Sequence, residues 1–207
     1  MEAHWSARYR EVGDDYLFGM EPNKFLAQHA DLFSPGQTAL SIADGEGRNS
    51  VWLAKQGLVV NAIEISPVAV AKAHKLSAAR AVAVKLEIGD ILAPNWPPPA
   101  WSNHFDWVVG IFVQFVGPLD RQRQFAAMKT VARPGGRIFL HGYTPKQLEY
   151  RTGGPSELAN LYTPELLRGE FSDWTIEELV EYEDDINEGS RHCGKSALIG
   201  MVAMKKG

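Results

Sequence analysis

One stretch in the first third of the chain constrains the fold more than any other. A short apolar run, Thr38–Ala43, breaks at the turn Asp44-Gly45-Glu46-Gly47, and a helical pattern then follows and ends at Gly57. A second run, Leu58–Ile65, is rich in β-branched residues and carries Glu64 close to its end. Strand, glycine turn, helix, strand and acid in this order are typical of the nucleoside-binding half of a doubly wound α/β domain.

The acidic residues of the turn indicate which nucleoside would bind. Gly45 and Gly47 allow tight backbone angles and a close approach of a ligand to the main chain. A dinucleotide would place its pyrophosphate here, where Asp44 and Glu46 would oppose it. The same acids suit a ligand that carries a sulfonium and an ammonium group, as S-adenosylmethionine does. Glu64 follows Gly45 by the roughly 20 residues that place an acid on ribose hydroxyls.

The β-α alternation continues beyond this unit and predicts the architecture. Ser66-Pro67 is typical of a helix start, with serine as N-cap. An acidic run and an apolar run close the chain with a turn between them, so we expect them to form an antiparallel hairpin. The expected fold is α/β, a doubly wound, Rossmann-like mixed sheet of seven strands with helices on both faces. The expected strands are 38–43, 58–65, 83–88, 105–112, 137–141, 174–183 and 195–204.

The first 36 residues lie outside this alternation. Residues 3–11 read as a helix that places Trp5 and Tyr9 on one face. Aromatic residues interrupt the loop 16–23, and Pro22 is expected to begin a second helix. We expect a single domain over residues 1–207, with 1–36 as an N-terminal lid or cap block and 37–207 as the core. A block that only covers a sheet edge is the alternative.

Composition narrows the possible partners. The 207 residues carry a formal charge of −4, which gives no electrostatic footprint for nucleic acid. The single cysteine, Cys193, has no disulfide partner, and the isolated histidines lack metal-ligand spacing, so no metal is expected. Met1–Glu11 lacks a secretory pattern, and the apolar stretch Trp107–Leu119 is too short to span a membrane. We expect a cytoplasmic protein that acts on a small molecule, without a membrane or nucleic-acid partner.

Taken together, the order of elements and five short motifs resemble a class I S-adenosylmethionine-dependent methyltransferase. Within that superfamily the chain is similar to the small bacterial enzymes related to the tellurite-resistance and thiopurine methyltransferases. The resemblance covers essentially the whole chain. Its motifs are Tyr16–Asn23, Ala43–Asn49, Arg133–Gly136, Tyr150–Pro155, and Glu188-Gly189 followed by His192 and Gly194-Lys195.

The resemblance implies a set of cofactor contacts. The glycine turn would pass under the methionine half, and Glu64 would hold both ribose hydroxyls. Asp90 would meet the adenine amino group. The implied cofactor-binding residues are Trp5, Phe18, Ala43, Asp44, Gly45, Gly47, Arg48, Asn49, Glu64, Ile65, Asp90, Ile91, Ile111 and Phe112. Two positions depart from the superfamily, which usually has an acid at Ser41 and a glycine at Ala43. We expect Ala43 to be tolerated if the turn there is not left-handed.

The implied reaction is in-line methyl transfer, in which the protein mainly aligns the reacting atoms and excludes water. His141 and His192 are the candidate catalytic residues, although either could instead complete a hydrogen-bond network. Candidate substrate residues are Tyr16, Gln114, Tyr150 and Arg151, and Arg151 would suit an anionic substrate.

The sequence is compatible with four functions. The first is methylation of a small acceptor such as a thiol, a chalcogen oxyanion or a similar small nucleophile. A protein methyltransferase and a non-enzymatic S-adenosylmethionine-binding protein are the alternatives, and an NAD-dependent enzyme is more distant. The segment Gly110–Phe115 lacks the Asn/Asp-Pro-Pro-Tyr/Phe motif of enzymes that methylate DNA amino groups or glutamine.

Overall fold

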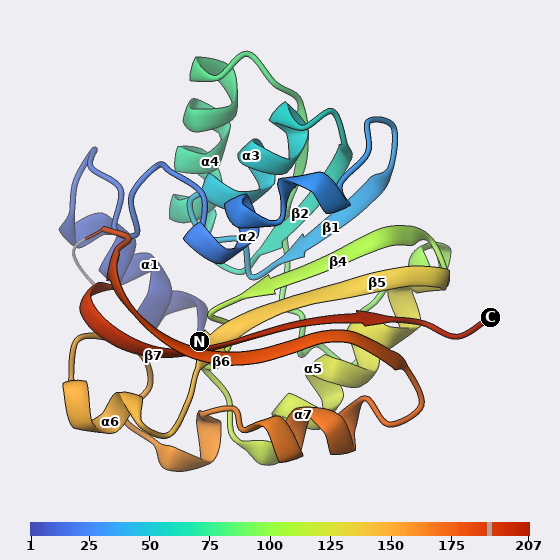
Figure 1. The fold of residues 1–207 in the computed structure, drawn as a ribbon. Helices are drawn as coiled ribbons and strands as arrows, with labels where there is room; N and C mark the ends of the chain where they lie inside the picture. Colours follow the sequence, from blue (N-terminus) through green and yellow to red (C-terminus); the bar gives the residue numbers. More distant parts are fainter. Residues whose placement is uncertain (190–191) are drawn as a thin grey trace.

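A computed structural model describes residues 1–189 and 192–207 of the chain. Within these residues the strands form one seven-stranded sheet in the order β3-β2-β1-β4-β5-β7-β6 (Figure 1). The strands are β1 (Thr38–Ile42), β2 (Val59–Glu64), β3 (Val84–Ile88), β4 (Phe105–Ile111), β5 (Ala132–Tyr143), β6 (Thr175–Asn187) and β7 (Cys193–Met204). This confirms the predicted mixed α/β sheet.

Strand direction reverses on either side of β7, which runs against all the other strands of the sheet. β1 to β5 are parallel, and β7 runs antiparallel to both β5 and β6. The long β6–β7 ladder is the predicted C-terminal hairpin. The acidic residues of β6 lie on an edge strand, where charged side chains discourage pairing with another chain.

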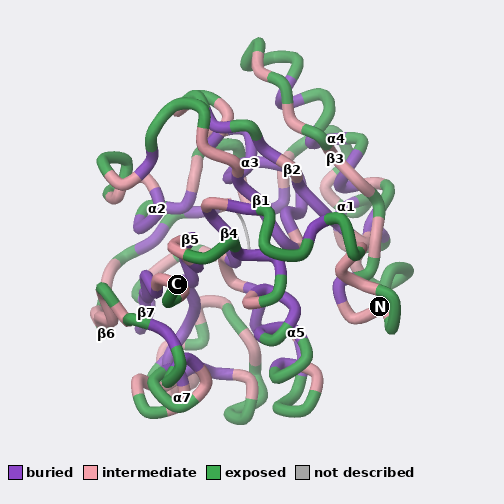
Figure 2. The backbone as a smooth tube through the Cα atoms, turned by 90° about the vertical axis from the view of Figure 1, so that its right-hand side faces the viewer, coloured by how far each residue is buried: buried purple, intermediate pink, exposed green. Residues whose placement is uncertain are grey.

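Helices cover both faces of the sheet. Figure 1 shows α2, α3 and α4 on one side and α5 and α7 on the other. The helices are α1 (Glu2–Glu11), α2 (Lys24–Gln28), α3 (Arg48–Lys55), α4 (Pro67–Ala79), α5 (Pro118–Val131), α6 (Gln147–Tyr150) and α7 (Pro164–Glu170). In Figure 2 buried residues concentrate in the central strands, whereas the edge strands β3 and β6 are largely intermediate or exposed, and exposed segments gather at turns and helix surfaces.

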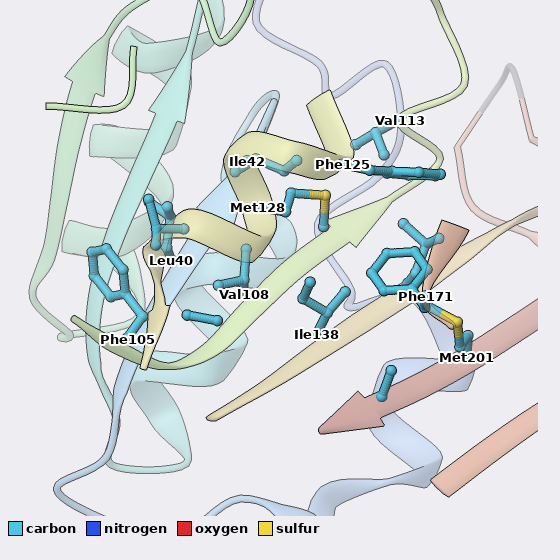
Figure 3. Packing of buried hydrophobic residues seen from close by; sticks show 14 of the residues in the cluster. Leu40, Ile42, Phe105, Val108, Val113, Phe125, Met128, Ile138, Phe171 and Met201 are labelled. Carbon is cyan, nitrogen blue, oxygen red and sulfur yellow. The ribbon is translucent and has the colours of Figure 1, made fainter. Parts of the chain in front are cut away.

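Successive side chains of each strand point to opposite faces of the sheet, and a hydrophobic cluster lies on each face. On one face Leu40 and Ile42 of β1 pack with Phe125 and Met128 of α5, and Phe171 at the end of α7 completes the cluster (Figure 3). On the other face Ala39 joins a cluster that includes side chains from α2 and α3. The two clusters fix the helices on a rigid sheet, and the strand ends are thereby fixed as well.

Local signals in the sequence explain most element ends, with one exception. Ser66 caps α4 by accepting from the Ala69 backbone NH at 3.3 Å, and Pro67 is the first helical residue, as predicted. Pro22 does not begin a helix, so that prediction is wrong. The helix α2 begins at Lys24, because the Asn23 side chain accepts from the Leu26 backbone NH at 3.1 Å and caps it.

Candidate active site

A cavity of about 810 Å³ lies at the carboxyl ends of the neighbouring strands β1 and β4. The chain continues from β1 to β2 on one side of this pair and from β4 to β5 on the other, so the strand order reverses here. Ligands of doubly wound sheets bind in the crevice at this point. Its floor is formed by residues at the ends of β1, β2, β3 and β4. An N-terminal wall consists of Trp5, Arg8, Tyr9 and Phe18, and a loop wall consists of residues 151–157.

The two glycines of the turn have different tasks. Gly45 lines the cavity at a φ of +63°, and its backbone NH donates to Glu64 Oε2 at 3.0 Å. Gly47 has a φ of +90°, and a Cβ there would lie 2.7 Å from the Cβ of Ala73 on α4. Gly47 is not among the described residues that line the cavity. The missing Cβ of Gly47 therefore permits close packing of α3 on α4, and its predicted contact with the cofactor stays a prediction.

The turn contains a strained alanine and a buried acid. Ala43 has a φ of +46°, so the turn is left-handed there, contrary to the condition set from the sequence. Such a conformation costs an L-residue about 1–2 kcal/mol. Asp44 offsets this strain by accepting from Ser41 Oγ at 2.6 Å and from Ser50 Oγ at 2.5 Å. Ser41 thus supports the turn from the position that usually holds an acid.

Glu64 ends β2 inside the cavity with 5% of its surface exposed. Its Oε2 accepts from the Gly45 backbone NH and its Oε1 accepts from the Ser66 backbone NH at 2.9 Å. Burial raises the pKa of Glu64, and the two backbone donors oppose that rise. A carboxylate offers about four acceptor positions, so the side chain is fixed and can still accept from a ligand.

The charge of Glu46 is already neutralised inside the protein. Its Oε1 accepts from Lys72 Nζ on α4 at 2.9 Å. The Lys72 ammonium also donates to the carbonyls of Tyr9 and Asp15, at 2.9 and 2.7 Å. The inference that both acids of the turn offer their charge to a ligand is therefore corrected for Glu46, which anchors the N-terminal block.

A second buried ion pair joins the glycine turn to the C-terminal hairpin. Arg48 Nη2 lies 2.6 Å from Glu188 Oε2, and each side chain is 7% exposed. Glu188 Oε1 also accepts from Asn23 Nδ2 at 2.9 Å, and the Asn23 backbone NH donates to Asn49 Oδ1 at 2.9 Å. Three segments distant in sequence therefore meet beside the cavity.

Comparison with known proteins identifies this arrangement. Residues 39–136 match the protein family described as Methyltransferase domain, a span that runs from β1 into β5 and includes the glycine turn, Glu64 and Asp90. The chain carries a class I S-adenosylmethionine-dependent methyltransferase domain. S-adenosylmethionine is its methyl donor.

Solved structures with the same methyltransferase fold have little sequence identity to the chain. A structure titled "Conversion of a Disulfide Bond into a Thioacetal Group during Echinomycin Biosynthesis" has a TM-score of 0.80 at 18% identity, covering 100% of this chain and 92% of that one. TehB from Haemophilus influenzae has a TM-score of 0.70 at 19% identity, covering 89% of this chain and 62% of that one.

A third similar structure holds the demethylated cofactor. Magnesium protoporphyrin IX methyltransferase from Synechocystis, with bound SAH, has a TM-score of 0.65 at 16% identity and covers 88% of this chain and 80% of that one. No curated protein matches the chain by sequence. These likenesses establish the methyltransferase fold and leave the acceptor open.

Except for Gly47, every residue predicted to bind the cofactor lines the cavity of the methyltransferase domain. They are Trp5, Phe18, Ala43, Asp44, Gly45, Arg48, Asn49, Glu64, Ile65, Asp90, Ile91, Ile111 and Phe112. Asp90 is exposed and accepts from the Leu92 backbone NH at 2.9 Å, whereas Ile91 is buried.

The two candidate histidines occupy different environments in the methyltransferase. His192 lines the cavity, with its ring 4.4 Å from Phe112 and 4.7 Å from Phe18 between centroids. His141 is 1% exposed, stacks on Phe25 and meets the Tyr182 hydroxyl through Nε2 at 2.9 Å. It is not among the described residues that line the cavity, so the structure argues against its contact with an acceptor.

Burial keeps both histidines neutral. The pKa of His192 is lowered to about 3, chiefly by burial and then by the charge of Arg48. The pKa of His141 is also lowered to about 3, by burial and then by Arg48 and His29. Nδ1 of each ring is buried without a partner among the described residues. Neither ring has the basicity of an efficient proton acceptor near neutral pH.

Of the four candidate substrate residues, two line the cavity and two do not. Gln114 and Arg151 line the cavity. The Gln114 amide is fully used, because it donates to the Tyr143 carbonyl and accepts from the Tyr143 backbone NH. Tyr16 donates to the Lys72 carbonyl, and Tyr150 lies beside the ammonium groups of Lys146 and Lys195. Neither tyrosine is among the described residues of the cavity.

Sequence reasoning missed several residues of the methyltransferase cavity. Arg8, Tyr9, Phe115 and Tyr143 all line it. Tyr9 could have been found, because the predicted helix already placed it on the face that carries Trp5. Its hydroxyl would meet a Cβ on Gly45 at 3.0 Å, so Tyr9 covers the glycine turn. Phe115 follows β4 by a few residues and Tyr143 is the last residue of β5, and neither carries a separate signal.

Two features are absent from the described residues. No helix in residues 1–189 and 192–207 is both long and apolar enough to cross a membrane. The same residues contain no group of three or more His, Cys, Asp and Glu side chains that could hold a metal ion.

Proposed function

We propose that this methyltransferase acts on a small-molecule acceptor with a soft nucleophile, such as a thiol. The two walls that flank the cavity support this proposal best. Trp5 and Phe18 contribute from the N-terminal wall, and residues 151–157 contribute from the loop wall, to the same cavity that contains Glu64. A protein methyltransferase would need an open groove beside the cofactor. Walls from the N-terminal block and from residues 151–157 favour a small acceptor instead.

The proposed cofactor placement follows from the fixed groups of the floor. Glu64 holds the ribose hydroxyls, since its carboxylate is oriented by two backbone donors and keeps free acceptor positions. Ile65 and Ile91 flank the adenine, and Asp90 accepts from its amino group. The Gly45 backbone passes under the methionine half.

The chemistry of the acceptor end favours a nucleophile that needs no strong base. S-adenosylmethionine supplies an activated methyl group bonded to a cationic sulfur. In the transfer the acceptor sulfur forms a bond to the methyl carbon as the carbon–sulfonium bond breaks, and any thiol proton passes to solvent. Phe112 and His192 border this end and exclude water, and the low pKa of His192 makes it a poor base. A thiolate suits such a site better than an alcohol or an ammonium group.

One structural neighbour is consistent with sulfur chemistry. The structure with a TM-score of 0.80 is titled for conversion of a disulfide bond into a thioacetal group, a change at sulfur. At 18% identity this supports the proposal only through the fold. The N-terminal block is then a cap, with its aromatic side chains over the cofactor and Lys72 and Glu188 as its anchors.

A turnover screen tests the proposal. The protein is incubated with S-adenosylmethionine and, in separate reactions, with aryl and alkyl thiols, selenite or tellurite, and small amines. S-adenosylhomocysteine and the methylated product are quantified together by mass spectrometry. We expect equal amounts of both products with at least one thiol. Cofactor binding without product from any acceptor would instead support a binding protein, and product only from amines would overturn the soft nucleophile.

A further inference from the structure

The loop wall is a built part of the cavity. Gln147 of α6 is 1% exposed, and its Nε2 donates to Thr152 Oγ1 at 3.0 Å and to the Gly153 carbonyl at 3.1 Å. The Gln147 Oε1 accepts from the Ala197 backbone NH of β7 at 2.8 Å. Thr152 Oγ1 also donates to the Lys195 carbonyl at 2.5 Å. These bonds fix the backbone of residues 152–153 against β7.

Arg151, which the sequence predicts to be a substrate residue suited to an anion, is the first residue of this wall. It follows the last helical residue of α6, at a φ of +56°, and its backbone NH donates to the Gln147 carbonyl at 3.2 Å. The side chain is exposed and lines the cavity. Within residues 1–189 and 192–207 no ion pair to its guanidinium occurs, whereas Arg48 is paired with Glu188. Arg151 therefore presents a charge at the cavity from a fixed position.

On the two walls of the cavity, basic side chains outnumber acidic ones. Arg8 lies on the N-terminal wall, and its guanidinium carbon is 4.7 Å from the centre of the Trp5 ring. Glu157 is the one acid of residues 151–157 and lies six positions beyond Arg151. Asp90 follows β3, at the adenine end of the proposed cofactor site. Two arginines against one glutamate favour an anion beside the cationic cofactor.

The apolar lining between the walls indicates the rest of the ligand. Trp5 meets Phe115 edge-on with centroids 6.3 Å apart, and Phe112 stacks on Tyr143 at 4.6 Å. All four rings line the cavity. Such a surface favours an apolar or aromatic body.

We propose that Arg151 binds an anionic group of the methyl acceptor, and that the acceptor is an aromatic or apolar thiol carrying a carboxylate. That the acceptor is a thiol rests on the proposed function. That it carries an anionic group rests on the position of Arg151 in the loop wall. A guanidinium binds a carboxylate through paired N–H donors, which fixes orientation as well as affinity. The methyl acceptor would thus be held at its anionic end while its sulfur reaches the methyl group.

The test uses a pair of acceptors that differ in charge and little in shape, 3-mercaptobenzoate and 3-mercaptobenzamide. Methylation of each is measured for the parent protein, for Arg151→Gln and for Arg168→Gln, which alters an exposed arginine on α7. In Arg151→Gln we expect KM for the benzoate to rise about tenfold, the effect of one solvent-exposed charge-assisted contact. The benzamide should show the same KM in all three proteins, and kcat should change less than twofold.

A binding experiment tests the anion site at Arg151 independently of whether the acceptor's nucleophile is a thiol. Calorimetry on the S-adenosylhomocysteine complex compares 3-(methylthio)benzoate with 3-(methylthio)benzamide. If neither thiol is methylated but the benzoate thioether binds about tenfold more tightly than the amide, and only Arg151→Gln removes that difference, the anion site stands and the thiol proposal fails. Equal affinities for the two thioethers, or equal effects of both arginine variants, would overturn the anion site.

Discussion

Glu46 of the glycine turn and Lys72 of α4 form an ion pair of 2.9 Å in which the side chains are 2% and 8% exposed. The same ammonium holds two carbonyls of the N-terminal block. One buried lysine therefore joins the glycine turn to the N-terminal block. Burial of such a pair gains little by itself, but loss of one partner leaves an uncompensated charge.

Lys72→Met is expected to lower the free energy of unfolding by about 3 kcal/mol, because Glu46 remains buried without its cation. The measurement is urea unfolding followed by circular dichroism. Lys75→Met is the matched control on the same helix, since its pair with Asp14 is largely exposed and should contribute less than about 0.5 kcal/mol. Adding Glu46→Gln to Lys72→Met should restore part of the loss. Equal stabilities of the Lys72 and Lys75 variants would contradict the assigned role.

Glu64→Ala is expected to weaken binding of S-adenosylhomocysteine by about 2–3 kcal/mol, roughly 30- to 150-fold, through loss of the ribose acceptor. Isothermal calorimetry measures the affinity, and the near-ultraviolet spectrum confirms that the variant is folded. Glu87→Ala is the control, because Glu87 belongs to β3 and pairs with Lys85 at the surface. Unchanged affinity in a folded Glu64 variant means that the ribose assignment is wrong.

His192→Asn is expected to lower kcat about tenfold and to leave the shape of its pH profile between pH 6 and 9 unchanged. The reason is that a ring with a pKa of about 3 stays neutral throughout this range and can align the acceptor without taking its proton. Steady-state rates across that range check the prediction. A loss of about 10²–10⁴-fold that removes a pH-dependent limb would assign proton transfer to His192 instead.

Stability should fall as the pH drops below 6.5. The pKa of buried His141 is lowered to about 3 from the ordinary 6.5, so between these values the unfolded chain binds a proton that the folded protein does not. The stabilising contribution is complete above pH 6.5 and is lost as the pH falls towards 3. We expect His141→Gln to flatten the slope of unfolding free energy against pH between 6.5 and 4. His74→Gln, at an exposed site on α4, should leave the slope unchanged.

Deletion of residues 1–20 is expected to abolish methyl transfer, because it removes Trp5, Tyr9 and Phe18 from the N-terminal wall and opens the cavity to water. Circular dichroism must first show that the sheet remains folded. Product formation is then measured at saturating S-adenosylmethionine. Full activity of the folded truncated protein would leave the cap without support.

Local chemistry made much of the fold predictable. Alternating β-branched runs and turn residues determined the strands, and Ser66 with Pro67 located the start of α4 because a cap acts within four residues. Gly45 and Glu64, which the sequence assigned to one site, both line the cavity. The prediction that Pro22 begins a helix was wrong, because the Asn23 side chain accepts from the Leu26 backbone NH and sets the start of α2 at Lys24.

Contacts made across long sequence separations were not predictable. Lys72 reads as an ordinary surface lysine on an alanine-rich helix until Tyr9 and Asp15 fold onto it. His141 was expected to end the fifth strand, but β5 continues to Tyr143, and β7 and β6 extend the sheet beyond it. Phe25 of α2 stacks on the His141 ring. Gly47 met the expected turn geometry, yet only the position of α4 reveals that its missing Cβ serves packing.

The bond between Asn23 and Glu188 has a consequence for the order in which the site can be completed. The two residues are 165 positions apart, and Glu188 supplies the acceptor for Asn23 Nδ2 and for the Lys24 backbone NH. During synthesis the glycine turn and the cap emerge from the ribosome long before the hairpin that anchors them. A nascent chain that ends before Glu188 therefore has β1, β2 and β3 but lacks this anchor, and high affinity for the methyl donor should arise only as synthesis ends.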